Sequence, residues 1–444
     1  MLRKDEILDV LEEWNYWQKN VDTDLFPRDD YIKKIKELLK TKEVVVLKGV
    51  RRSGKSTLLK LLIKELQQEI SKKQILLVNF EDPRFYPHLG LELLEEIFET
   101  YRTFVNPNGK CYILLDEIHY VEAWEKWVRK QRDLHPNEVK ILVTGSSSRL
   151  LDTEYSTALT GRTLPITVFP LSFKEYLLFS GVKLGDVCGM RLKRQIKAQL
   201  EKYMTVGGFP EMLLTGKQTL VQSYFDDILY KDIVDRFAVR DTKMMKRVAH
   251  FLLTNVSNEY TYNSLRKMIG SSMDLVRQYI GYIESSYLIY SVNMFSFSLK
   301  EQNVNPRKVY CIDNGLRNIV GFKFSEDYGK LYENTVFLEL KKTLDGSPLE
   351  IYYWKNESGK EVDFIVRHGM KTTAAIQVCW DMRNENTKKR EVDALLDAMK
   401  EFKLKKGLII TESSEGEESF DDKVVEYVPL WKWLVDSKYM QLSV

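Results

Sequence analysis

Short apolar runs alternate with longer amphipathic stretches between residues 41 and 170. Each run is almost continuous, and a polar stretch of helical length follows it. Runs of this kind are typical of strands that are buried on both faces. The pattern therefore predicts an α/β fold with a parallel sheet covered by helices on both sides. The expected strands are EVVVLKG, QILLVNF, KCYILLDE, KILVTGSSS and TLPITVF.

The pattern changes three times after residue 170. Residues 171–242 are helical apart from a break at VGGFPE, and residues 243–312 predict three short helices followed by two strands. A chain of 444 residues is too long for one ordinary core, so several domains are expected. We expect an N-terminal helical segment at 1–30, a sheet domain at 31–170, a helical lid at 171–242, a small module at 243–312 and an α/β domain at 313–444.

A phosphate-binding loop is predicted directly after the first strand. Residues 47–59, LKGVRRSGKSTLL, fit the pattern G-x-x-x-x-G-K-[ST]. Glycines let backbone N–H groups curl around an anion, and the next helix directs the positive end of its dipole to the same place. The pattern places Lys55 at the β- and γ-phosphates of ATP and Ser56 at Mg²⁺. The expected nucleotide contacts are Gly49, Val50, Arg51, Arg52, Ser53, Gly54, Lys55, Ser56 and Thr57.

A chance match to this pattern is the alternative, but few chance matches have an apolar strand before them and an amphipathic helix after them. Arg51 and Arg52 stand at inner positions of the loop, where glycine is not required. We expect their side chains to point outward, toward the lid, a neighbouring molecule or the substrate.

Two acidic residues end the strand CYILLDE. The carboxyl ends of parallel strands open onto one crevice, so Asp116 is expected near Ser56 and the metal. Glu117 is expected to polarise a water molecule in line with the γ-phosphate. The alternative is a simple helix N-cap. The next strand ends in a hydroxyl cluster, which either contacts the γ-phosphate or the attacking water, or caps the following helix: Thr144, Ser146, Ser147 and Ser148.

The overall composition narrows the choice of function only a little. The net charge of +3 neither requires nor excludes a nucleic-acid partner. No window approaches eighteen uninterrupted apolar residues, and the start MLRKDEILDVLEEW does not resemble a signal peptide. We therefore expect a cytoplasmic protein without a membrane span. The four scattered cysteines are expected to be buried free thiols: Cys111, Cys188, Cys311 and Cys379.

The module at 243–312 has a winged-helix-like pattern. TYNSLRKMIGSSMDLVRQYIGYIESSYLIYSV predicts a helix, a turn at GSS, a second helix and an apolar strand. Winged helices bind either DNA or proteins, and both alternatives stay open. The basic residues that would meet DNA phosphates are Arg266, Lys267 and Arg277, with Lys300 and Arg307 as weaker candidates.

The order of these motifs resembles the AAA+-type P-loop ATPases of bacteria and archaea. The motifs are the phosphate loop, NFEDPR, YILLDEIH, VTGSSSRLL, LTGRTLPITVFPLSFKEYL and GGFPE, followed by RKVYCIDNGLRN, LYENTVFLEL and KEVDFIV of an uncharacterised C-terminal domain. The resemblance implies that Asp116 is the magnesium aspartate and Glu117 the catalytic glutamate. It places Ser146 at the sensor position, where asparagine is more usual, and Arg162 at the arginine finger.

The resemblance therefore gives Glu117, Lys55, Arg162 and Ser146 as the catalytic residues. An arginine finger acts in a neighbouring subunit, so a homo-oligomer is a further expectation. A salt bridge or a helix C-cap is the alternative role for Arg162.

The predicted elements after residue 330 are similar to the core of PD-(D/E)xK nucleases. Their order is helix 331–343, strands 350–354, 361–367 and 374–379, helix 388–400 and strand 406–410. In such enzymes a helical Glu, a strand Asp and a (D/E/Q)-x-K pair surround Mg²⁺. The corresponding residues are Glu333, Asp363 and Gln377.

The lysine position of the third nuclease motif is Cys379, and a neutral thiol cannot supply the missing charge. Glu361 and Lys371 are the candidates that would have to substitute. We therefore expect a non-catalytic descendant of a nuclease, with a charged strand pair of unrelated origin as the alternative.

Together these features predict an ATP-binding, Mg²⁺-dependent ATPase that couples its nucleotide state to DNA binding or remodelling. Two alternatives remain. One is a signalling ATPase whose C-terminal half binds a protein partner, and the other is an ATP-regulated nuclease.

Overall fold

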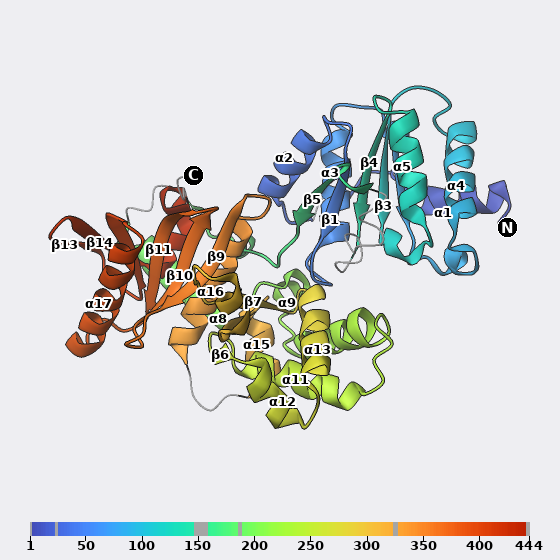
Figure 1. The fold of residues 1–444 in the computed structure, drawn as a ribbon. Helices are drawn as coiled ribbons and strands as arrows, with labels where there is room; N and C mark the ends of the chain where they lie inside the picture. The colour runs from blue at the N-terminus through green and yellow to red at the C-terminus, as the bar shows by residue number, and fades with distance from the viewer. Residues whose placement is uncertain (1, 23–24, 146–158, 185–188, 323–326, 441–444) are drawn as a thin grey trace. The chain divides into compact units, whose positions relative to one another are not determined.

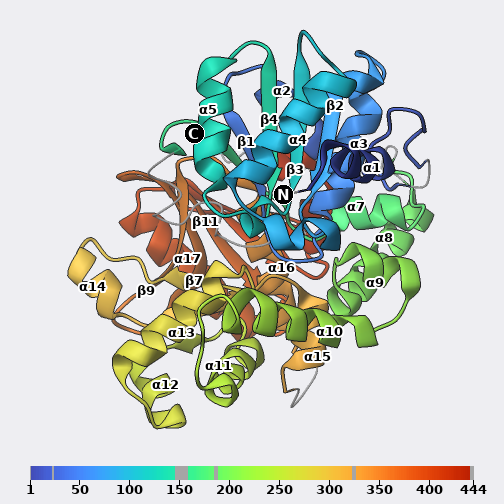
Figure 2. The same cartoon turned by 90° about the vertical axis from the view of Figure 1, so that its right-hand side faces the viewer.

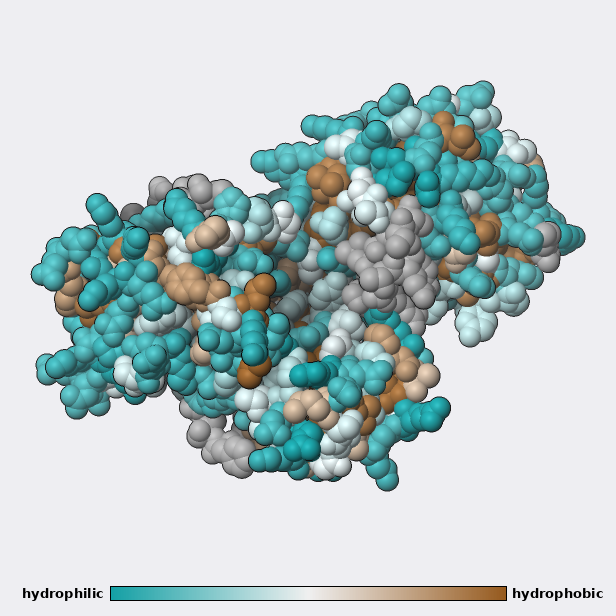
Figure 3. Space-filling view, in the orientation of Figure 1, coloured by the Kyte–Doolittle hydropathy of each residue, from teal (hydrophilic) through white to brown (hydrophobic). Residues whose placement is uncertain are grey.

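The structure is a computed structural model of the chain, and it describes residues 2–22, 25–145, 159–184, 189–322 and 327–440. The chain divides into two compact units, Met1–Val168 and Phe169–Val444 (Figure 1). None of the helices in these ranges is long and apolar enough to cross a membrane. In the view of Figure 3 the surfaces of both units are mainly hydrophilic, and hydrophobic residues form small separate groups.

The first unit is built on a five-stranded parallel sheet with the strand order β2-β3-β4-β1-β5. The strands are β1 (Val44–Lys48), β2 (Ile75–Asn79), β3 (Cys111–Asp116), β4 (Val139–Thr144) and β5 (Thr163–Thr167). The sequence prediction of a parallel sheet is thus confirmed. Every residue of β3 and β4 is buried, which explains why these strands are apolar without alternation.

Helices cover both faces of this sheet (Figure 1). Helices α1 (Lys4–Trp14), α4 (Leu91–Phe104) and α5 (Trp124–Leu134) pack against one face, and α2 (Asp29–Leu38) and α3 (Lys55–Leu66) against the other. Successive residues of β1 alternate between the two cores: Val44 and Val46 face the first group, and Val45 and Leu47 the second. Short 3₁₀ turns lie at Lys72–Gln74, Pro83–His88 and Ile118–Tyr120.

The second unit begins with helices and a small sheet. Figure 2 shows these helices as a green and yellow group. They are α7 (Phe173–Phe179), α8 (Met190–Val206), α9 (Pro210–Thr215), α10 (Thr219–Asp227) with a π-helical continuation at Ile228–Val234, α11 (Thr242–Thr254), α12 (Tyr262–Ile269) and α13 (Met273–Ser285). The antiparallel sheet has the order β6-β8-β7. Its strands are β6 (Glu259–Tyr260), β7 (Ile289–Asn293) and β8 (Arg307–Cys311), with α14 (Leu299–Val304) between the last two.

A six-stranded mixed sheet follows, with the order β13-β14-β12-β11-β10-β9. The strands are β9 (Leu349–Lys355), β10 (Glu361–His368), β11 (Lys371–Cys379), β12 (Lys406–Thr411), β13 (Gly416–Phe420) and β14 (Lys423–Pro429). Helix α17 (Glu385–Glu401) packs on one face of it. The other face carries α16 (Tyr328–Thr343) together with α7, α8 and α18 (Leu430–Val435). The helices and strands predicted between residues 331 and 410 are therefore present, each with bounds within a few residues of those expected.

Two motifs far apart in the sequence form one joint in this unit. Asp313 caps α15 (Asn314–Val320) by accepting the Leu316 N–H at 3.0 Å, and its other oxygen accepts the Gly208 N–H at 2.6 Å. A Cβ atom at Gly207, where φ is +85°, would lie 2.1 Å from the Asp313 carboxylate. A Cβ at Gly315 would lie 2.0 Å from the carbonyl oxygen of Val206. The glycines of VGGFPE and DNGLRN are thus required by a close approach of two backbones.

Candidate functional site

The phosphate loop connects β1 to the N-terminus of α3. Gly49 has φ of +139°, and a Cβ there would lie 2.3 Å from the Val168 carbonyl oxygen, so only glycine fits. Gly54 has φ of +96° and precedes the first residue of α3. The loop thus leads its backbone N–H groups to the positive end of a twelve-residue helix, which is a suitable place for an anion.

Lys55 lies at the start of α3 with its side chain folded over the loop. Its Nζ donates to the carbonyl oxygens of Gly49 and Val50, both at 3.1 Å. Lys55 is buried, whereas Ser56 beside it is exposed. Two of the acceptors that hold the lysine above the loop are thus neutral, and a phosphate oxygen can take their place as a stronger, charged acceptor.

The strand ends next to the loop carry the predicted acidic pair. β4 lies between β1 and β3 in the sheet, so the ends of all three strands meet at the same edge. The Ser56 hydroxyl is hydrogen-bonded to the carboxylate of Asp116. The Thr144 hydroxyl donates to Asp116 Oδ1 at 2.5 Å and accepts the Glu117 N–H at 3.0 Å. Thr144 therefore orients both acids.

Glu117 sits on a constrained backbone. Its φ of +52° and ψ of +43° place it in the left-handed region, which is uncommon for a residue with a side chain. Its Oε2 lies 3.2 Å from Nδ1 of His119. Burial by itself would raise the pKa of Glu117, but the hydrogen bond with His119 and the charges of Lys55 and Arg51 outweigh burial and lower the pKa. Glu117 is thus held as a carboxylate.

Asp116 has the opposite electrostatic balance. Burial and the neighbouring charge of Glu117 raise the pKa of Asp116, although hydrogen bonds from Thr144 and Ser56 and the charge of Lys55 oppose the rise. A carboxylate that is buried beside a second carboxylate favours a cation next to it. The Ser56 hydroxyl and the Asp116 carboxylate are both oxygen donors of the kind that Mg²⁺ prefers, so these residues fit the predicted magnesium site.

The two loop arginines differ from each other. Arg52 is exposed, as expected for an outward-pointing side chain. The expectation is wrong for Arg51, because its side chain is only 13% exposed, lies 3.7 Å from Glu81 and forms a hydrogen bond with the Tyr120 phenol. Arg51 therefore links the loop to the segments that follow β2 and β3.

Sequence reasoning missed three residues of this site. Arg28 is buried, donates to the carbonyl oxygen of Ser53 at 3.0 Å and stacks on the ring of Tyr31. Arg28 lies in FPRDD, which looks like a linker in the sequence. The proline before the start of a helix was the only feature that could have drawn attention to Arg28. His119 and Tyr120 follow the acidic pair after one intervening residue in DEIHY. The sequence therefore shows that they are close to the pair along the chain, but not which atoms they contact.

The structure does not bring the other two predicted catalytic residues, Ser146 and Arg162, into the described site. Ser146, with Ser147 and Ser148, falls outside the described residues. Arg162 precedes β5, and its carbonyl accepts the N–H of Val44 at the start of β1. It is therefore at the edge of the sheet opposite the phosphate loop, with its Nε 3.9 Å from Asp133. Arg162 is therefore not part of the nucleotide site of its own chain.

The basic residues predicted for DNA contact are on the surface of the second unit. Arg266 and Lys267 are exposed on α12, and Arg277 is exposed on α13. Arg277 and Arg307 both lie over the ring of Tyr262, at 5.3 and 4.8 Å from its centroid. Arg307 also donates to the Tyr262 hydroxyl. Arg307 is thus engaged within the protein, while Arg266 and Lys267 face solvent.

The predicted nuclease-like residues do come together. Glu333 on α16 and Asp363 on β10 contact the same ammonium group, and Gln377 on β11 contacts the backbone of Asp363. Cys379 is buried, and Lys371 is exposed at the opposite end of β11. The ammonium group belongs to Lys308, which sequence reasoning missed because it lies in the ordinary strand RKVYC.

Three family models match successive parts of the chain. A model described as an AAA domain matches residues 41–177. Two models described as domains of unknown function, DUF8612 and DUF4143, match residues 197–326 and 328–433. The prediction of an AAA+-type P-loop ATPase domain is confirmed by the first of these matches.

Two relatives match almost the whole chain. The "Uncharacterized protein MJ1544" of Methanocaldococcus jannaschii is 33% identical over 406 residues, which cover 88% of this chain and 88% of the relative. An "Uncharacterized protein" of Haemophilus influenzae is 30% identical over 419 residues, which cover 92% of this chain and 98% of the relative.

Solved structures resemble the chain more distantly. PCH-2 of C. elegans is 16% identical with a TM-score of 0.32, covering 50% of this chain and 65% of that one. The ORC1 protein of Aeropyrum pernix, solved in complex with DNA, is 12% identical with a TM-score of 0.31, covering 72% and 97%. TM-scores this low carry no argument about the function of the chain.

Proposed function

The chain belongs to the same family as the two proteins of M. jannaschii and H. influenzae, and we propose that it is a Mg²⁺-dependent AAA+-type ATPase that couples its nucleotide state to DNA binding. One observation carries the ATPase part of this proposal. A buried lysine, an exposed serine hydroxyl and two buried carboxylates converge where β1, β3 and β4 end. That combination supports both the binding of a triphosphate and its hydrolysis.

The roles of the residues follow from their contacts. The loop N–H groups and Lys55 bind the phosphates, while Ser56 and Asp116 hold Mg²⁺, which neutralises charge on the phosphates when bound. Glu117 accepts the proton of the attacking water, since its lowered pKa keeps it deprotonated. His119 lies beside the Glu117 carboxylate, with its Nδ1 3.2 Å from Oε2. Thr144 couples the positions of the two acids.

The DNA part of the proposal depends on the exposed cations of α12 and α13. Arg266, Lys267 and Arg277 offer three charges to a phosphate backbone, and Arg247 on α11 is exposed beside α12. Contacts of this type position a duplex without reading its sequence. We therefore propose weakly sequence-selective binding.

The decisive experiment measures the ATPase rate alone and with single-stranded, duplex and branched DNA. Hydrolysis that requires Mg²⁺ and rises with one form of DNA supports the whole proposal. Hydrolysis that no DNA changes, together with no DNA binding at low salt, leaves the ATPase and removes the DNA partner, because low salt is the condition that most favours electrostatic binding.

A second candidate function is a switch ATPase that binds a protein, and one observation favours it. A cavity of about 510 Å³ lies between α11 and α12, and its lining is mainly apolar, with Phe251, Met268 and Phe322 exposed to it. Lys243, Lys246 and Arg247 also line it. An apolar hollow beside cations suits a hydrophobic side chain of an acidic peptide better than it suits a phosphate backbone. Substitution Met268→Gln, which adds no charge beside Lys267, weakens protein binding but spares DNA binding if this candidate is correct.

A further inference from the structure

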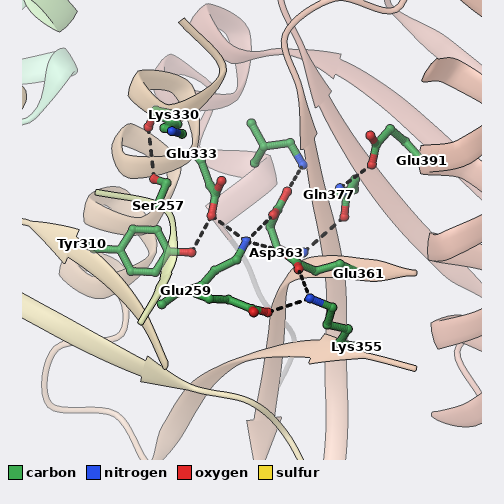
Figure 4. Close-up of polar contacts among 12 residues, drawn as sticks. Ser257, Glu259, Tyr310, Lys330, Glu333, Lys355, Glu361, Asp363, Gln377 and Glu391 are labelled. Atoms are coloured by element: carbon green, nitrogen blue, oxygen red, sulfur yellow. Dashed lines mark hydrogen bonds and ion pairs between the residues drawn. The ribbon is translucent and has the colours of Figure 1, made fainter. Parts of the chain in front are cut away.

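A buried lysine joins three acidic residues in the second unit, and Figure 4 labels these acids, Glu333, Glu361 and Asp363. Lys308 Nζ lies 2.6 Å from Glu361, 2.8 Å from Asp363 and 2.9 Å from Glu333. The side chain of Lys308 is only 3% exposed. The three acids come from α16 and β10, and the lysine comes from β8, so the cluster connects one helix with strands of two different sheets.

The strand that carries Lys308 is fixed on both sides. β8 is the central strand of its sheet, with Glu259 and Val292 opposite Lys308 on the two neighbours. Tyr310, two residues further on, donates its hydroxyl to the same Glu333 oxygen at 2.7 Å. Asn334 of α16 bonds both the N–H and the carbonyl oxygen of Cys311. The central strand β8 therefore positions Lys308 beside the acids, and no loop is involved.

Both carboxylate oxygens of Asp363 and the side-chain oxygen of Gln377 are already engaged. One oxygen of Asp363 accepts from Lys308, and the other accepts the Val378 N–H at 2.9 Å. The side-chain oxygen of Gln377 accepts the Asp363 N–H at 3.1 Å, and its amide donates to Glu391 at 2.6 Å. Among the described residues no group of three or more His, Cys, Asp or Glu side chains is arranged to hold a metal ion. The residues thus do not fit the metal that the nuclease resemblance implies.

The electrostatic balance also favours the lysine. Burial by itself would lower the pKa of Lys308, but Asp363, Glu333 and Glu361 raise it well above its ordinary value, so the amine stays charged. Lys355 adds a second cation at the rim, 2.9 Å from Glu259 and 3.5 Å from Glu361. The cluster therefore contains its own counter-charges.

We propose that Lys308 takes the place of the divalent cation in this nuclease-like cluster, so that the cluster fastens β8 to α16 and β10 and binds no metal ion. The missing lysine at position 379 is then a secondary difference. The primary difference from a nuclease site is the ammonium group at the centre of the acids, which comes from a strand outside the predicted nuclease fold. This inference does not depend on the proposed ATPase function, because no residue of the nucleotide site takes part.

The first test measures Mn²⁺ binding to the intact chain by electron paramagnetic resonance, without nucleotide. An Asp116→Asn background removes the metal site of the first unit, and Asp363→Asn is compared in that background. The expected result is the same Mn²⁺ binding with and without Asp363→Asn. Binding of one Mn²⁺ that Asp363→Asn abolishes would overturn the proposal, as would Mn²⁺-dependent DNA cleavage that this substitution abolishes.

The second test removes the lysine. Lys308→Met leaves buried acids without their cation, and we expect the melting temperature to fall by roughly 10 °C. Mn²⁺ should then raise the melting temperature of Lys308→Met more than that of the parent, because the acids are left to find another cation. The control, Lys371→Met, removes an exposed lysine of the same sheet and should change neither value.

An equal response of the parent and Lys308→Met to Mn²⁺ would contradict the proposal, and so would an unchanged melting temperature. Should Lys308→Met not fold, Lys308→Met combined with Glu333→Gln reduces the uncompensated charge by one. We expect this double variant to fold, because less negative charge is left buried without a partner. Lys308→Arg keeps the positive charge and serves as the comparison. If Lys308→Arg folds and the double variant does not, the charges of Lys308 and Glu333 do not compensate each other.

Discussion

Two buried lysines, Lys55 in the first unit and Lys308 in the second, stand beside buried carboxylates and yet have different partners. Lys55 is 4% exposed and donates to two neutral carbonyl oxygens of its own loop. Lys308 is 3% exposed and contacts three acidic side chains. A carbonyl oxygen can release an ammonium group to a phosphate at little cost, whereas a set of carboxylates cannot. The partners of a buried lysine, more than its burial, therefore decide whether it binds a ligand or holds the fold.

The acidic residues beside Lys55 and those beside Lys308 also differ in their surroundings. In the first unit Asp116 and Glu117 lie at strand ends beside the exposed Ser56, and they are in contact with Thr144 and His119. In the second unit the acids are turned toward a cation of the chain itself. One cluster has the arrangement of a reaction site, and the other has that of a structural joint. Each prediction below tests one side of this contrast.

The largest expected effect comes from Arg162. If it acts as an arginine finger in a neighbouring subunit, Arg162→Ala lowers the ATPase rate by about 10³–10⁵ and leaves ATP affinity intact. Arg129→Ala is the matched control, because Arg129 also pairs with Asp133, at 3.6 Å. Equal rates for the two variants would show that Arg162 is only a salt-bridge residue. Rate per subunit should also rise with protein concentration.

Substitution of the proposed general base is expected to have the next largest effect. Glu117→Gln should lower turnover by about 10²–10⁴ while ATP still binds, because only the activation of water is lost. Glu333→Gln, an equal change in the other cluster, should leave turnover unchanged. Steady-state hydrolysis and nucleotide titration measure the two properties separately. Hydrolysis by Glu117→Gln at the parent rate would refute the assignment of the base.

The same substitution at the two lysines should give opposite results. Lys308→Met should lower the free energy of unfolding by about 3–5 kcal/mol and leave ATP affinity unchanged. Lys55→Met should lower that free energy by less than Lys308→Met does, since two of its acceptors are neutral carbonyl oxygens, and should weaken ATP binding by about 100-fold. Chemical denaturation without nucleotide and nucleotide titration give the two values. Similar losses of unfolding free energy in Lys55→Met and Lys308→Met would contradict the proposed difference between the two lysines.

The smallest effect is expected at the proposed DNA surface. Removing the side chains of Lys267 and Arg277 together should weaken binding to unrelated duplexes equally and flatten the slope of log affinity against log salt by about 2, because each phosphate contact contributes about 0.9. ATPase activity without DNA should not change. An unaltered salt slope would place the DNA, if any binds, on another surface.

The sequence predicts the first unit well because its information is local. The phosphate loop occupies residues 47–59 without a gap, and the acidic pair follows an apolar strand directly. Parallel strands then bring these separate ends together, since they share one edge of the sheet. What the sequence could not show was the direction of side chains, and Arg51 is the example. An inner loop position was expected to point outward, but Glu81 and Tyr120 draw its guanidinium inward.

Only some residues of the Lys308 cluster in the second unit could be predicted from the sequence. Glu333, Asp363 and Gln377 were found through the order of helices and strands, which the structure confirms. Lys308 could not be found in this way, because it precedes that order and comes from a strand of a different sheet. Nothing in RKVYC distinguishes a lysine at the surface from one that is buried among acids. Only the pairing of β8 with its neighbours decides which side of the strand the lysine occupies.

The origin of Lys308 outside the C-terminal sheet matters for anyone who divides this chain for expression. The boundary suggested by the sequence, between residues 312 and 313, would produce a fragment with Glu333, Glu361 and Asp363 but without their lysine. Such a fragment would have to capture protons or divalent ions from the buffer to balance these charges. A metal found in it would then be an artefact of the cut and would falsely suggest an enzyme. A boundary placed before β8, which begins at Arg307, keeps the acids with their natural counter-ion.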